Sequence, residues 1–436
     1  MKRTPRVLVI SHNVFSQNSG MGKTLANMLS CIPPDEIAQL YFHAEVPTMP
    51  VCQSYCRIMD SDVLKSIATR RISCRFFDKS DVRPGKKKSR IDRGFLAQIY
   101  QFSRRRTPLI HLLRDSLWRI GKWESPQLWE WLRNFEPDVI FFASGDYSFP
   151  YKITCKIAER FDIPVILWCC DDYYLKKQPE IVLGSVYKKW LLTWVHRVSK
   201  FTLSLVVISD EMARDYSRLF AGKDIHTLRI AAEQSGEILP QQQRHRIVYA
   251  GNLGINRSVP LVALGKALRR LPIPEYEAID VYSGEKDPKI LADLTEKNGI
   301  HFHGAASPEE IKTILGSAKY LLHVEAFDLK SRERTRYSLS TKIGESLASG
   351  ACLIAYGPEE ISSISYLAAN DGAVILHAAE ELPNVIQELE ADPMLYAERV
   401  KKSRALAQRN HSKEHNDKLL RELFIAAIKG KRGSGT

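Results

Sequence analysis

The stretch YSLSTKIGESLASGACLIAYGP, residues 337–358, carries the most informative pattern in the chain, because a loop, a helix and a buried strand follow one another in it. Ser340 and Thr341 are residue types that cap helices. Lys342 falls in the first helical turn, where the helix dipole disfavours a cation unless an anion also binds there. Glu345 comes three residues later and therefore shares a helix face with Lys342.

Two interpretations of this stretch follow from the residues alone. Hydroxyl groups and a lysine at a helix start suit a diphosphate, and a carboxylate one turn away suits the hydroxyl groups of a ribose. On the other interpretation, Lys342 and Glu345 form an ordinary ion pair on a surface helix. The residues around the stretch are needed to choose between the two.

Short apolar runs rich in β-branched residues recur along the chain, each followed by a loop and a helical pattern. Near-continuous apolar strands that alternate with helices predict a parallel sheet covered on both faces. The strands expected in the first half are 6–11, 138–144, 163–170 and 204–209. Those expected in the second half are 246–251, 279–284, 300–304, 319–325, 352–357 and 373–377.

The polar segment QSGEILPQQQRH, residues 234–245, interrupts the two series and is expected to be a linker. We therefore predict an α/β protein with two Rossmann-like parallel-sheet domains, at residues 1–238 and 239–412, facing each other across a cleft. Residues 413–436 are expected to form a final helix and a flexible tail, with the helix packing back on the first domain. Ligands of open α/β sheets bind beyond the carboxyl ends of the strands, which places the expected active site in the cleft.

The N-terminal segment SHNVFSQNSGMGKTLANML, residues 11–29, ends like a nucleotide-binding P-loop. A P-loop requires an earlier glycine, and that position holds Gln17. The dinucleotide fingerprint fails as well, since Gly20 and Gly22 fit but Leu25 stands in the third glycine position. What remains is a strand, a glycine-containing loop and a helix start, which would present backbone N–H groups at the sheet edge. A plain tight turn is the alternative.

The bulk composition excludes several classes of protein. No apolar run reaches the roughly 18–20 residues needed to span a bilayer, and the N-terminus lacks the pattern of a signal peptide. The eight cysteines include no C-x-x-C pair, which argues against a zinc framework or a secreted disulfide scaffold. We therefore expect a cytoplasmic protein whose cysteines are mostly buried thiols.

The net charge of +13 is concentrated in residues 79–122, which hold thirteen Lys and Arg against Asp81, Asp92 and Asp115. This basic insertion predicts an anionic partner, and we favour the surface of a membrane over nucleic acid. A solvated loop and helix face is the alternative. The cations considered most important are Lys86, Lys87, Lys88, Arg104, Arg105 and Arg106, and the apolar residues among them are Phe95, Leu96, Ile99, Tyr100 and Phe102.

The stretch at 337–358 resembles the nucleotide-sugar site of the GT-B glycosyltransferases, especially the retaining family 4 group, also called glycosyl transferases group 1. In that group a Ser/Pro-rich loop precedes Lys, two further residues, Glu, a helix of small residues ending in Gly, and an apolar strand. The segment STKIGESLASGACLIA has this pattern. Residues 246–268 and 300–315 look like the beginning and middle of the family's C-terminal domain, and residues 11–29 look like its first N-terminal loop.

The resemblance implies a role for each matching residue. Glu345 would bind the donor ribose, while Lys342 and Arg257 would neutralise the diphosphate leaving group in catalysis. The remaining donor-binding residues implied by the resemblance are Gly20, Gly22, Asn252, Ser340 and Thr341. Enzymes of this fold stabilise the leaving diphosphate with cations and helix dipoles, so neither a metal nor a cofactor is expected.

The sequence departs from the family at one position of the motif. The family commonly has two glutamates separated by seven residues, and the earlier position here holds Tyr337. Because that glutamate usually contacts the transferred sugar, an inactive glycosyltransferase-like protein is an alternative. Glu325 and Asp328 are candidates to take its place.

Polar residues at predicted strand ends in the first half are candidates for acceptor chemistry. Asp146 and His12 are candidate catalytic residues, and Asp171 and Asp172 are candidate acceptor-binding residues, since carboxylates can accept hydrogen bonds from sugar hydroxyls. The alternative is structural, because Asp is common in turns and a histidine at such a place can simply be packed.

We therefore predict a hexosyl-type glycosyltransferase, retaining by the resemblance, that moves a sugar from a nucleoside diphosphate sugar to a glycan or lipid-linked acceptor, as in surface polysaccharide synthesis. It would be cytoplasmic and peripheral on the inner face of the cell membrane. The rivals are a P-loop-like nucleotide-binding protein, a nucleic-acid-binding protein that uses the basic insertion, and the inactive relative.

Overall fold

The computed structural model describes residues 4–82, 107–175, 182–232, 239–270 and 276–433. The chain divides into two compact units. The first unit runs from the N-terminal residues to Ile208 and also includes Met212–Leu228 and the residues from Asn416 onward. The second unit contains Ser209–Glu211 and Arg229–His415. Along the chain, the change from the first unit to the second falls after Leu228.

The first unit is built on a sheet whose eight described strands lie in the order β4-β3-β2-β1-β5-β6-β7-β8. Neighbouring strands run parallel, except that the edge strand β4 is antiparallel to β3. The strands are β1 (Val7–Ser11), β2 (Ile37–Tyr41), β3 (Ser54–Arg57), β4 (Arg75–Asp78), β5 (Val139–Ala143), β6 (Val165–Cys169), β7 (Thr202–Val207) and β8 (Asp224–Thr227).

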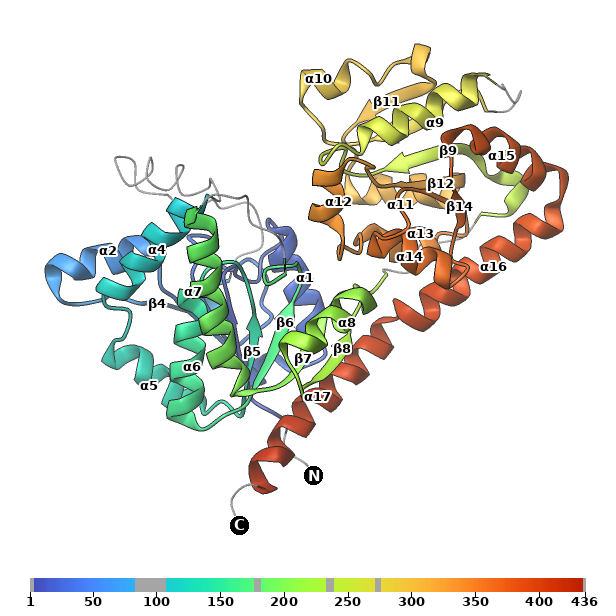
Figure 1. The fold of residues 1–436 in the computed structure, drawn as a ribbon. Helices are drawn as coiled ribbons and strands as arrows, with labels where there is room; N and C mark the ends of the chain where they lie inside the picture. The colour runs from blue at the N-terminus through green and yellow to red at the C-terminus, as the bar shows by residue number, and fades with distance from the viewer. Residues whose placement is uncertain (1–3, 83–106, 176–181, 233–238, 271–275, 434–436) are drawn as a thin grey trace. The chain divides into compact units, whose positions relative to one another are not determined.

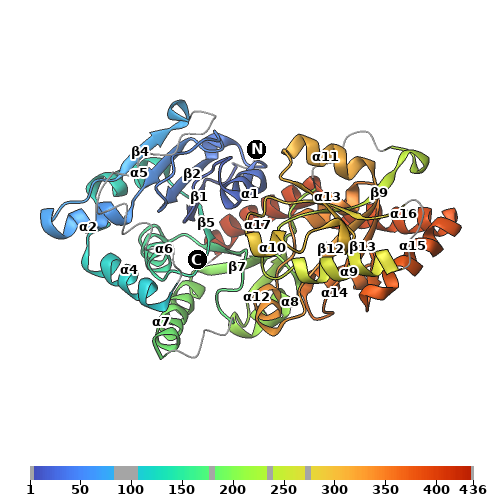
Figure 2. The same cartoon turned by 90° about the horizontal axis from the view of Figure 1, so that it is seen from above.

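Helices cover both faces of this sheet (Figure 1). They are α1 (Gly20–Leu29), α2 (Asp60–Thr69), α4 (Pro108–Ile120), α5 (Pro126–Phe135), α6 (Phe149–Phe161), α7 (Val182–Ser199), α8 (Asp210–Leu219) and α17 (Lys413–Gly433). The last of these, α17, buries Leu420, Leu423 and Phe424 in one hydrophobic core with residues of β1, β5 and α1. The ring of Phe424 meets that of Phe141 edge to face, with 5.9 Å between the ring centroids. Helices α4, α6 and α7 lie on the opposite face (Figures 1 and 2).

The second unit has a fully parallel sheet whose described strands lie in the order β11-β10-β9-β12-β13-β14. They are β9 (His245–Ala250), β10 (Ile279–Tyr282), β11 (Ile300–Gly304), β12 (Ala318–Val324), β13 (Cys352–Tyr356) and β14 (Val374–Leu376). The helices are α9 (Ser258–Arg270), α10 (Pro288–Leu291), α11 (Pro308–Ser317), α12 (Leu329–Thr335), α13 (Lys342–Ala348), α14 (Ser362–Ala369), α15 (Leu382–Ala391) and α16 (Pro393–Asn410). Counted along the chain, this is the 3-2-1-4-5-6 order of a Rossmann fold.

Each of the ten predicted strands overlaps an observed strand, and the predicted α/β class with two Rossmann-like domains is confirmed. The sequence analysis missed β2, β3, β4 and β8. Strand β2 holds a fully buried Gln39, and β3 ends on the buried Arg57. Polar residues at these places hide the apolar pattern by which buried strands are recognised.

The structure also bears on the classes that composition excluded. All eight cysteines lie in described ranges, and each is a free thiol there. Across the described ranges, no helix combines the length and the hydropathy that crossing a bilayer requires. Most of the predicted basic insertion, residues 83–106, lies outside the described residues, so that Lys86–Lys88, Arg104–Arg106 and the apolar side chains at 95–102 receive no structural account.

His411, near the end of the second unit, forms hydrogen bonds with the segment at residues 230–232 near its beginning. Its imidazole Nδ1 donates to the carbonyl of Ile230 at 2.9 Å, and its Nε2 accepts from the hydroxyl of Tyr366 at 3.1 Å. The backbone N–H of Ala232 donates to the carbonyl of His411 at 2.9 Å. Gly344, in the opening stretch, has to be a glycine because a Cβ would come within 2.9 Å of this imidazole. The imidazole of His411 thus packs against the first turn of α13.

Burial lowers the pKa of His411 from 6.5 to about 4, so the second unit should lose stability in acid. The pKa of His411 is lower in the folded state than in the unfolded state. The stability that the neutral His411 contributes is therefore complete above pH 6.5 and is lost as the pH falls toward 4. We expect wild type to lose about 3 kcal/mol more unfolding free energy than His411→Gln between about pH 7 and pH 4. Denaturant unfolding at each pH measures this difference. The exposed His245→Gln should follow wild type, and parallel pH curves for wild type and His411→Gln would contradict the assignment.

Candidate functional site

The second unit has a cavity of about 490 Å³ at the carboxyl edge of its sheet. Residues that follow β9, β10 and β11 form most of its wall, and the first residue of α13 completes it. The lining residues are Gly251, Asn252, Tyr282, Ser283, Gly284, Glu285, Ala305, Ala306, Ile311 and Lys342. This is the edge at which open α/β sheets bind ligands.

The loop after β9 is held in a fixed shape by its own contacts. The hydroxyl of Tyr249 donates to the carbonyl of Asn252 at 2.8 Å, and the N–H of Gly254 donates to the Asn252 side chain at 2.7 Å. Ile255 and Asn256 both have positive φ angles, of 60° and 55°. The Asn256 amide donates to Asp328 at 3.0 Å, which ties the loop to the start of α12. Backbone in such conformations persists only where the surroundings hold it, so the loop arrives preformed.

Lys342 enters the cavity from the first turn of α13. Its ammonium donates to the carbonyl of Ala250 at 3.1 Å, at the end of β9. Desolvation lowers the pKa of Lys342, and the nearby Glu345 opposes this effect. An anion in the cavity would favour the charged form of the lysine, so the site suits a phosphate or diphosphate group.

Arg257 lies at the start of α9 and is engaged by a buried carboxylate. Its Nε and Nη2 atoms each donate to one oxygen of Glu325 at 3.0 Å, so the pair is bidentate. Glu325 is 1% exposed and the Arg257 side chain 16%. His323 is the penultimate residue of β12. Its Nε2 lies 3.7 Å from Glu325, and burial lowers the pKa of this histidine. Arg257 is thus held rigidly, and it is absent from the lining of the described cavity.

Tyr282, in the lining of the second unit's cavity, packs on a second aromatic ring. The ring of Tyr282 stacks on that of His303, with 4.6 Å between centroids and 12° between planes. His303 Nε2 lies 2.7 Å from the carboxylate of Asp280, which is buried in β10. The sequence analysis did not single out any of the three. Their signal was present, since Asp280 and Tyr282 on β10 and His303 on β11 fall at strand positions that point to one face.

The first unit has its own cavity, of about 460 Å³, at the carboxyl ends of β1, β5 and β6. It is lined by Ser11, His12, Asn13, Met21, Leu25, His43, Asp60, Arg114, Ala143, Ser144, Gly145, Asp146, Tyr147, Pro150, Cys170 and Tyr173. The strand order reverses between β1 and β5, so this cavity occupies the topological switch point of its sheet.

A buried cation forms one side of the first cavity. The Arg114 guanidinium on α4 donates to Asp60 at 3.0 Å and stacks over the ring of Tyr147, 4.1 Å from its centroid. Trp118 also donates to Asp60, at 2.6 Å. The ion pair holds the guanidinium in place, and the charges of Arg114 and Asp60 offset each other on this side of the cavity. None of these residues was predicted, because the helix and the loops that supply them are far apart in sequence.

His12 and Asp146, predicted as catalytic residues, both line this cavity. The ring of His12 lies 5.5 Å from that of His43 and 5.9 Å from that of Tyr147. The backbone carbonyl of Asp146 accepts a hydrogen bond from Tyr187 at 2.6 Å, which fixes the loop after β5. The carboxylate of Asp146 lies 3.9 Å from Nε2 of His111, and Asp146 lines the cavity together with His12 and His43.

The glycine loop of the first unit is organised by the buried Gln39. Its side chain donates to Ser11 at 2.8 Å and to the carbonyl of Asn13 at 3.1 Å, and it accepts from the N–H of Phe15 at 3.1 Å. Gly22 is required because a Cβ there would lie 2.4 Å from the carbonyl of Val14. These contacts hold the loop in one conformation.

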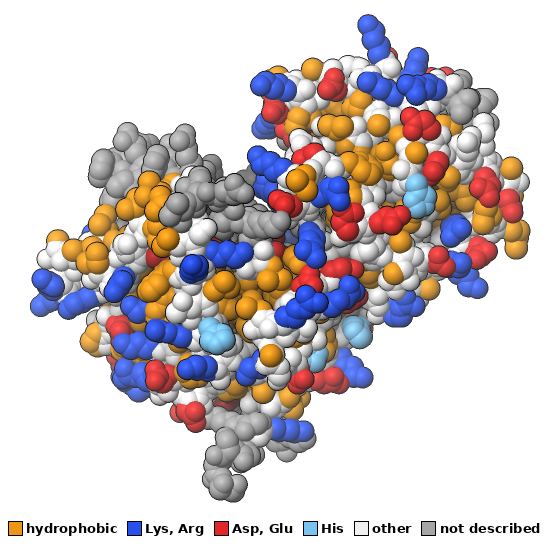
Figure 3. Space-filling model, in the orientation of Figure 1, with side chains coloured by type: hydrophobic (Ala, Val, Ile, Leu, Met, Phe, Trp, Pro, Cys, Tyr) orange, Lys and Arg blue, Asp and Glu red, His pale blue; other side chains and the backbone are white. Residues whose placement is uncertain are grey.

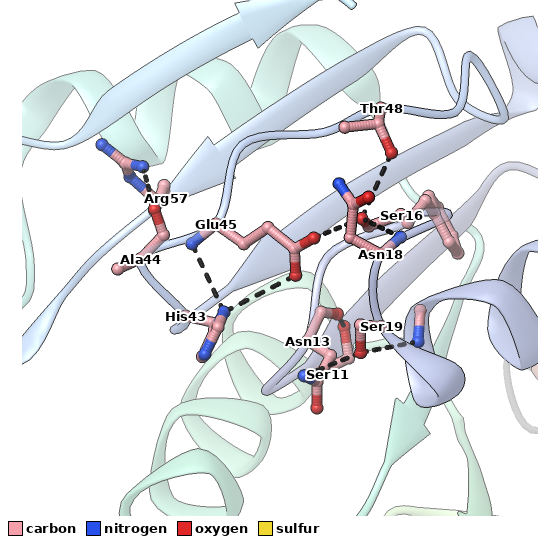
Figure 4. A network of polar contacts seen from close by, with 12 residues as sticks. Ser11, Asn13, Ser16, Asn18, Ser19, His43, Ala44, Glu45, Thr48 and Arg57 are labelled. Atoms are coloured by element: carbon pink, nitrogen blue, oxygen red, sulfur yellow. Dashed lines mark hydrogen bonds and ion pairs between the residues drawn. The ribbon is translucent and has the colours of Figure 1, made fainter. Parts of the chain in front are cut away.

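The rest of the loop belongs to a polar network (Figure 4). Ser16 donates to Glu45 and accepts from Thr48, and the carboxylate of Glu45 lies 3.8 Å from His43. Ser19 caps α1 by accepting from the N–H of Gly22. The network connects the loop to His43 and hence to the cavity wall.

Several predicted residues do not line either described cavity. Asp172 accepts from the N–H groups of Tyr174 and Leu175 and from the hydroxyl of Tyr216, as a turn-stabilising carboxylate does. Tyr337, in the place of the first family glutamate, is 4% exposed, with the Arg336 guanidinium over its ring. The others are Gly20, Gly22, Asp171, Arg257, Ser340, Thr341 and Glu345. Of the predicted set, the structure brings Asn252 and Lys342 together, and His12 and Asp146 together.

Comparisons with known proteins bear on the fold and on one region of the sequence. Residues 264–422, which contain Lys342 and Glu345, match the family model described as glycosyl transferase-like. No protein of curated function matches the chain significantly.

Solved structures match over nearly the whole chain. HepE of Anabaena in complex with UDP is 11% identical with a TM-score of 0.61, over 97% of this chain and 100% of that one. Sucrose-phosphate synthase of Thermosynechococcus elongatus is 14% identical with a TM-score of 0.57, over 97% and 100%. An α,α-trehalose-phosphate synthase of Burkholderia xenovorans in complex with glucose 6-phosphate is 12% identical with a TM-score of 0.55, over 96% and 100%. At these identities the likeness establishes a shared fold.

Replacing Arg257 alone should destabilise the second unit, because it leaves the buried Glu325 carboxylate without its partner. We expect Arg257→Ala to lower the free energy of unfolding by about 3–5 kcal/mol, and Arg257→Met/Glu325→Leu to restore most of the loss. Denaturant unfolding followed on the second unit measures both. Arg270→Ala is the matched control, since its 3.7 Å pair with Glu380 is exposed on both sides and should contribute about 1 kcal/mol or less. Equal effects of Arg257→Ala and Arg270→Ala would contradict this account.

Proposed function

We propose that this chain, which has the GT-B glycosyltransferase fold and a glycosyl transferase-like region at residues 264–422, transfers a sugar from a nucleoside diphosphate sugar to a hydroxyl-bearing acceptor. The predicted fold class and the family resemblance are confirmed at the level of fold. The proposal goes further, to an activity with a glycan or lipid-linked acceptor in the cytoplasm.

The observation that carries the proposal is the position of Lys342 in the cavity of the second sheet. A preformed loop on one side and the ammonium of Lys342 on the other provide a place for the diphosphate of a donor. Negative charge grows on the leaving diphosphate as the glycosidic bond breaks, and a fixed cation lowers the energy of that transition state. Glu345, one turn behind Lys342, would accept hydrogen bonds from the ribose.

The first cavity suits the acceptor. It offers a carboxylate at Asp146, imidazoles at His12 and His43, and the aromatic rings of Tyr147 and Tyr173. Carboxylates accept hydrogen bonds from sugar hydroxyls, and a histidine near neutral pH can take or give a proton. HepE binds UDP, and one trehalose-phosphate synthase binds glucose 6-phosphate, which supports a nucleotide donor and a sugar acceptor for this fold.

Retention of configuration and transfer of a hexose are part of the proposal on the strength of the resemblance. Glu325 could not serve freely in place of the first family glutamate, because Arg257 engages both of its oxygens. The rival P-loop reading has Lys23 as its active cation, and this exposed lysine is absent from the lining of the first cavity. The inactive relative is the second candidate, favoured by the buried Tyr337, and it would bind the nucleotide without turnover.

Nucleotide binding should depend on Glu345. In a thermal-shift screen of UDP, GDP, ADP and their sugars, at least one should stabilise the protein, by about 2.7 kcal/mol at 100 times its Kd. Since a charged hydrogen bond contributes about 1.5–3 kcal/mol, Glu345→Gln should weaken that nucleotide by at least about tenfold in calorimetry. The exposed Glu398→Gln on α16 is the control and should bind normally. Unchanged affinity in Glu345→Gln would remove this residue from the site, and the absence of binding by any nucleotide would remove the proposal.

Lys342→Ala should lower kcat more than it weakens donor binding. The ammonium meets more negative charge in the transition state than in the bound donor, and we expect about a hundredfold loss, as for removal of one oxyanion-stabilising donor. Steady-state kinetics with the donor found in the screen measure kcat and KM separately. Lys401→Ala, exposed on α16, is the matched control. A rise in KM with unchanged kcat would mean that Lys342 serves ground-state binding alone.

A further inference from the structure

Two helices of the first unit present apolar side chains to solvent in rows. On α4 the row contains Leu109, Leu113 and Ile120, which are 51%, 58% and 71% exposed. On α7 it begins with Leu183 and Val186, which are 41% and 50% exposed. Positions 109, 113 and 120 repeat at helical spacing, as do 183, 186 and 190, so each row follows one helix face.

The tertiary structure joins the two rows into one surface, which we call the α4–α7 face. The Arg119 guanidinium on α4 lies over the ring of Trp190 on α7, 5.9 Å from its centroid. Trp190 in turn meets Trp194 edge to face, with 6.1 Å between centroids. Helices α4 and α7 run side by side in both views of the ribbon (Figures 1 and 2). Scattered exposed leucines need no explanation, but a contiguous apolar surface on two helices does.

The exposed charges on helices α4 and α7 themselves have a single sign. Residues 182–200 contain no Asp or Glu, and the sole acid of α4, Asp115, is buried against the N–H groups of Ser148 and Phe149. Apart from Arg114, which pairs with Asp60, the cations on the two helices and just after them are Arg119, Lys122, Lys188, Lys189, Arg197 and Lys200. Figure 3 shows hydrophobic and basic side chains intermixed over this part of the first unit.

We propose that the α4–α7 face docks the protein on the surface of an anionic phospholipid bilayer. Leu, Ile and Val at the centre would enter the headgroup region, while Lys and Arg around them would meet lipid phosphates, as amphipathic interfacial helices do. Tryptophan suits this depth, since its ring is apolar and its N–H is polar. Trp190 already has an internal partner for its N–H, because it donates to Ser148 at 2.9 Å, so its ring is held in place at the face.

Two other occupants fit the face less well. A second copy of the chain would bring the same cations against one another, and like charges in contact oppose association. A nucleic acid would be held through its phosphates by the cations alone and would leave the exposed Leu and Ile without a role. The bilayer is the partner whose chemistry uses both the apolar rows and the charges.

Vesicle flotation tests the proposal without donor or acceptor, so the result is independent of the transfer activity. Wild type should float with vesicles of phosphatidylcholine mixed with phosphatidylglycerol, and not with phosphatidylcholine alone. Leu113→Gln/Ile120→Gln should weaken binding about tenfold, because two apolar side chains leave the interface. Leu329→Gln/Met394→Gln, at residues 69% and 80% exposed in the second unit, is the matched control and should bind as wild type does. These variants leave residues 83–106 unchanged, so a loss is assigned to the α4–α7 face.

Charge and depth provide two further readouts. Lys189→Gln/Lys200→Gln should weaken vesicle binding by about thirtyfold, since each cation near an anionic leaflet contributes about 1 kcal/mol, whereas Lys297→Gln/Lys401→Gln should have no effect. Brominated lipid should quench tryptophan emission in wild type and less in Trp194→Phe. Wild type that stays soluble, that floats equally with neutral vesicles, or that floats as well after Leu113→Gln/Ile120→Gln would overturn the proposal. So would a dimer that the same double variant dissociates, or binding of RNA in place of vesicles.

Discussion

Both units depend on one topological constraint, which is that the strands of a parallel sheet end at a common edge and that the order of strands reverses beside the first one. In the first unit the reversal lies between β1 and β5, and in the second between β9 and β12. The chain leaves the two strands beside the reversal toward opposite faces of the sheet, so the loops that follow these strands diverge. Each described cavity lies at the carboxyl edge of its sheet, where open α/β sheets bind ligands.

Buried polar side chains then fix the loops at these edges. Gln39 holds the loop after β1, and Glu325 holds Arg257 at the start of α9. Arg244, 2% exposed, donates to the carbonyls of Leu239, Ala318 and Ser349 at 2.8–3.0 Å and so ties the entry of the second unit to two later segments. An unpaired buried polar group would lower the free energy of unfolding by about 1–3 kcal/mol. The loops are therefore restricted to conformations that keep these hydrogen bonds. That restriction supplies the preorganisation on which a transferase site relies.

The two cavities carry different chemical groups, as the proposed reaction between a donor and an acceptor requires. The cavity of the second unit has the ammonium of Lys342 and a preformed glycine loop, which suit a diphosphate. The cavity of the first unit has Asp146, two histidines and aromatic rings, which suit the hydroxyl groups of a sugar. The α4–α7 face adds a third element to the first unit, so the side of the protein proposed to receive the acceptor is also the side proposed to meet lipid.

The sequence by itself determined the fold class, ten of the strands, and the lysine and asparagine of the second cavity. It could do so because buried parallel strands are continuously apolar, and because the motif around Lys342 lies within one loop and one helix. Only the tertiary structure decided that Arg257 is engaged by Glu325, that Arg114 and Asp60 form a wall beside His12, and that the apolar rows of α4 and α7 make one surface. These arrangements join residues that are far apart in the sequence, with 54 positions between Asp60 and Arg114 and 68 between Arg257 and Glu325. Local pattern carries the information about a helix or a strand, whereas a contact between distant segments is set by how whole elements pack.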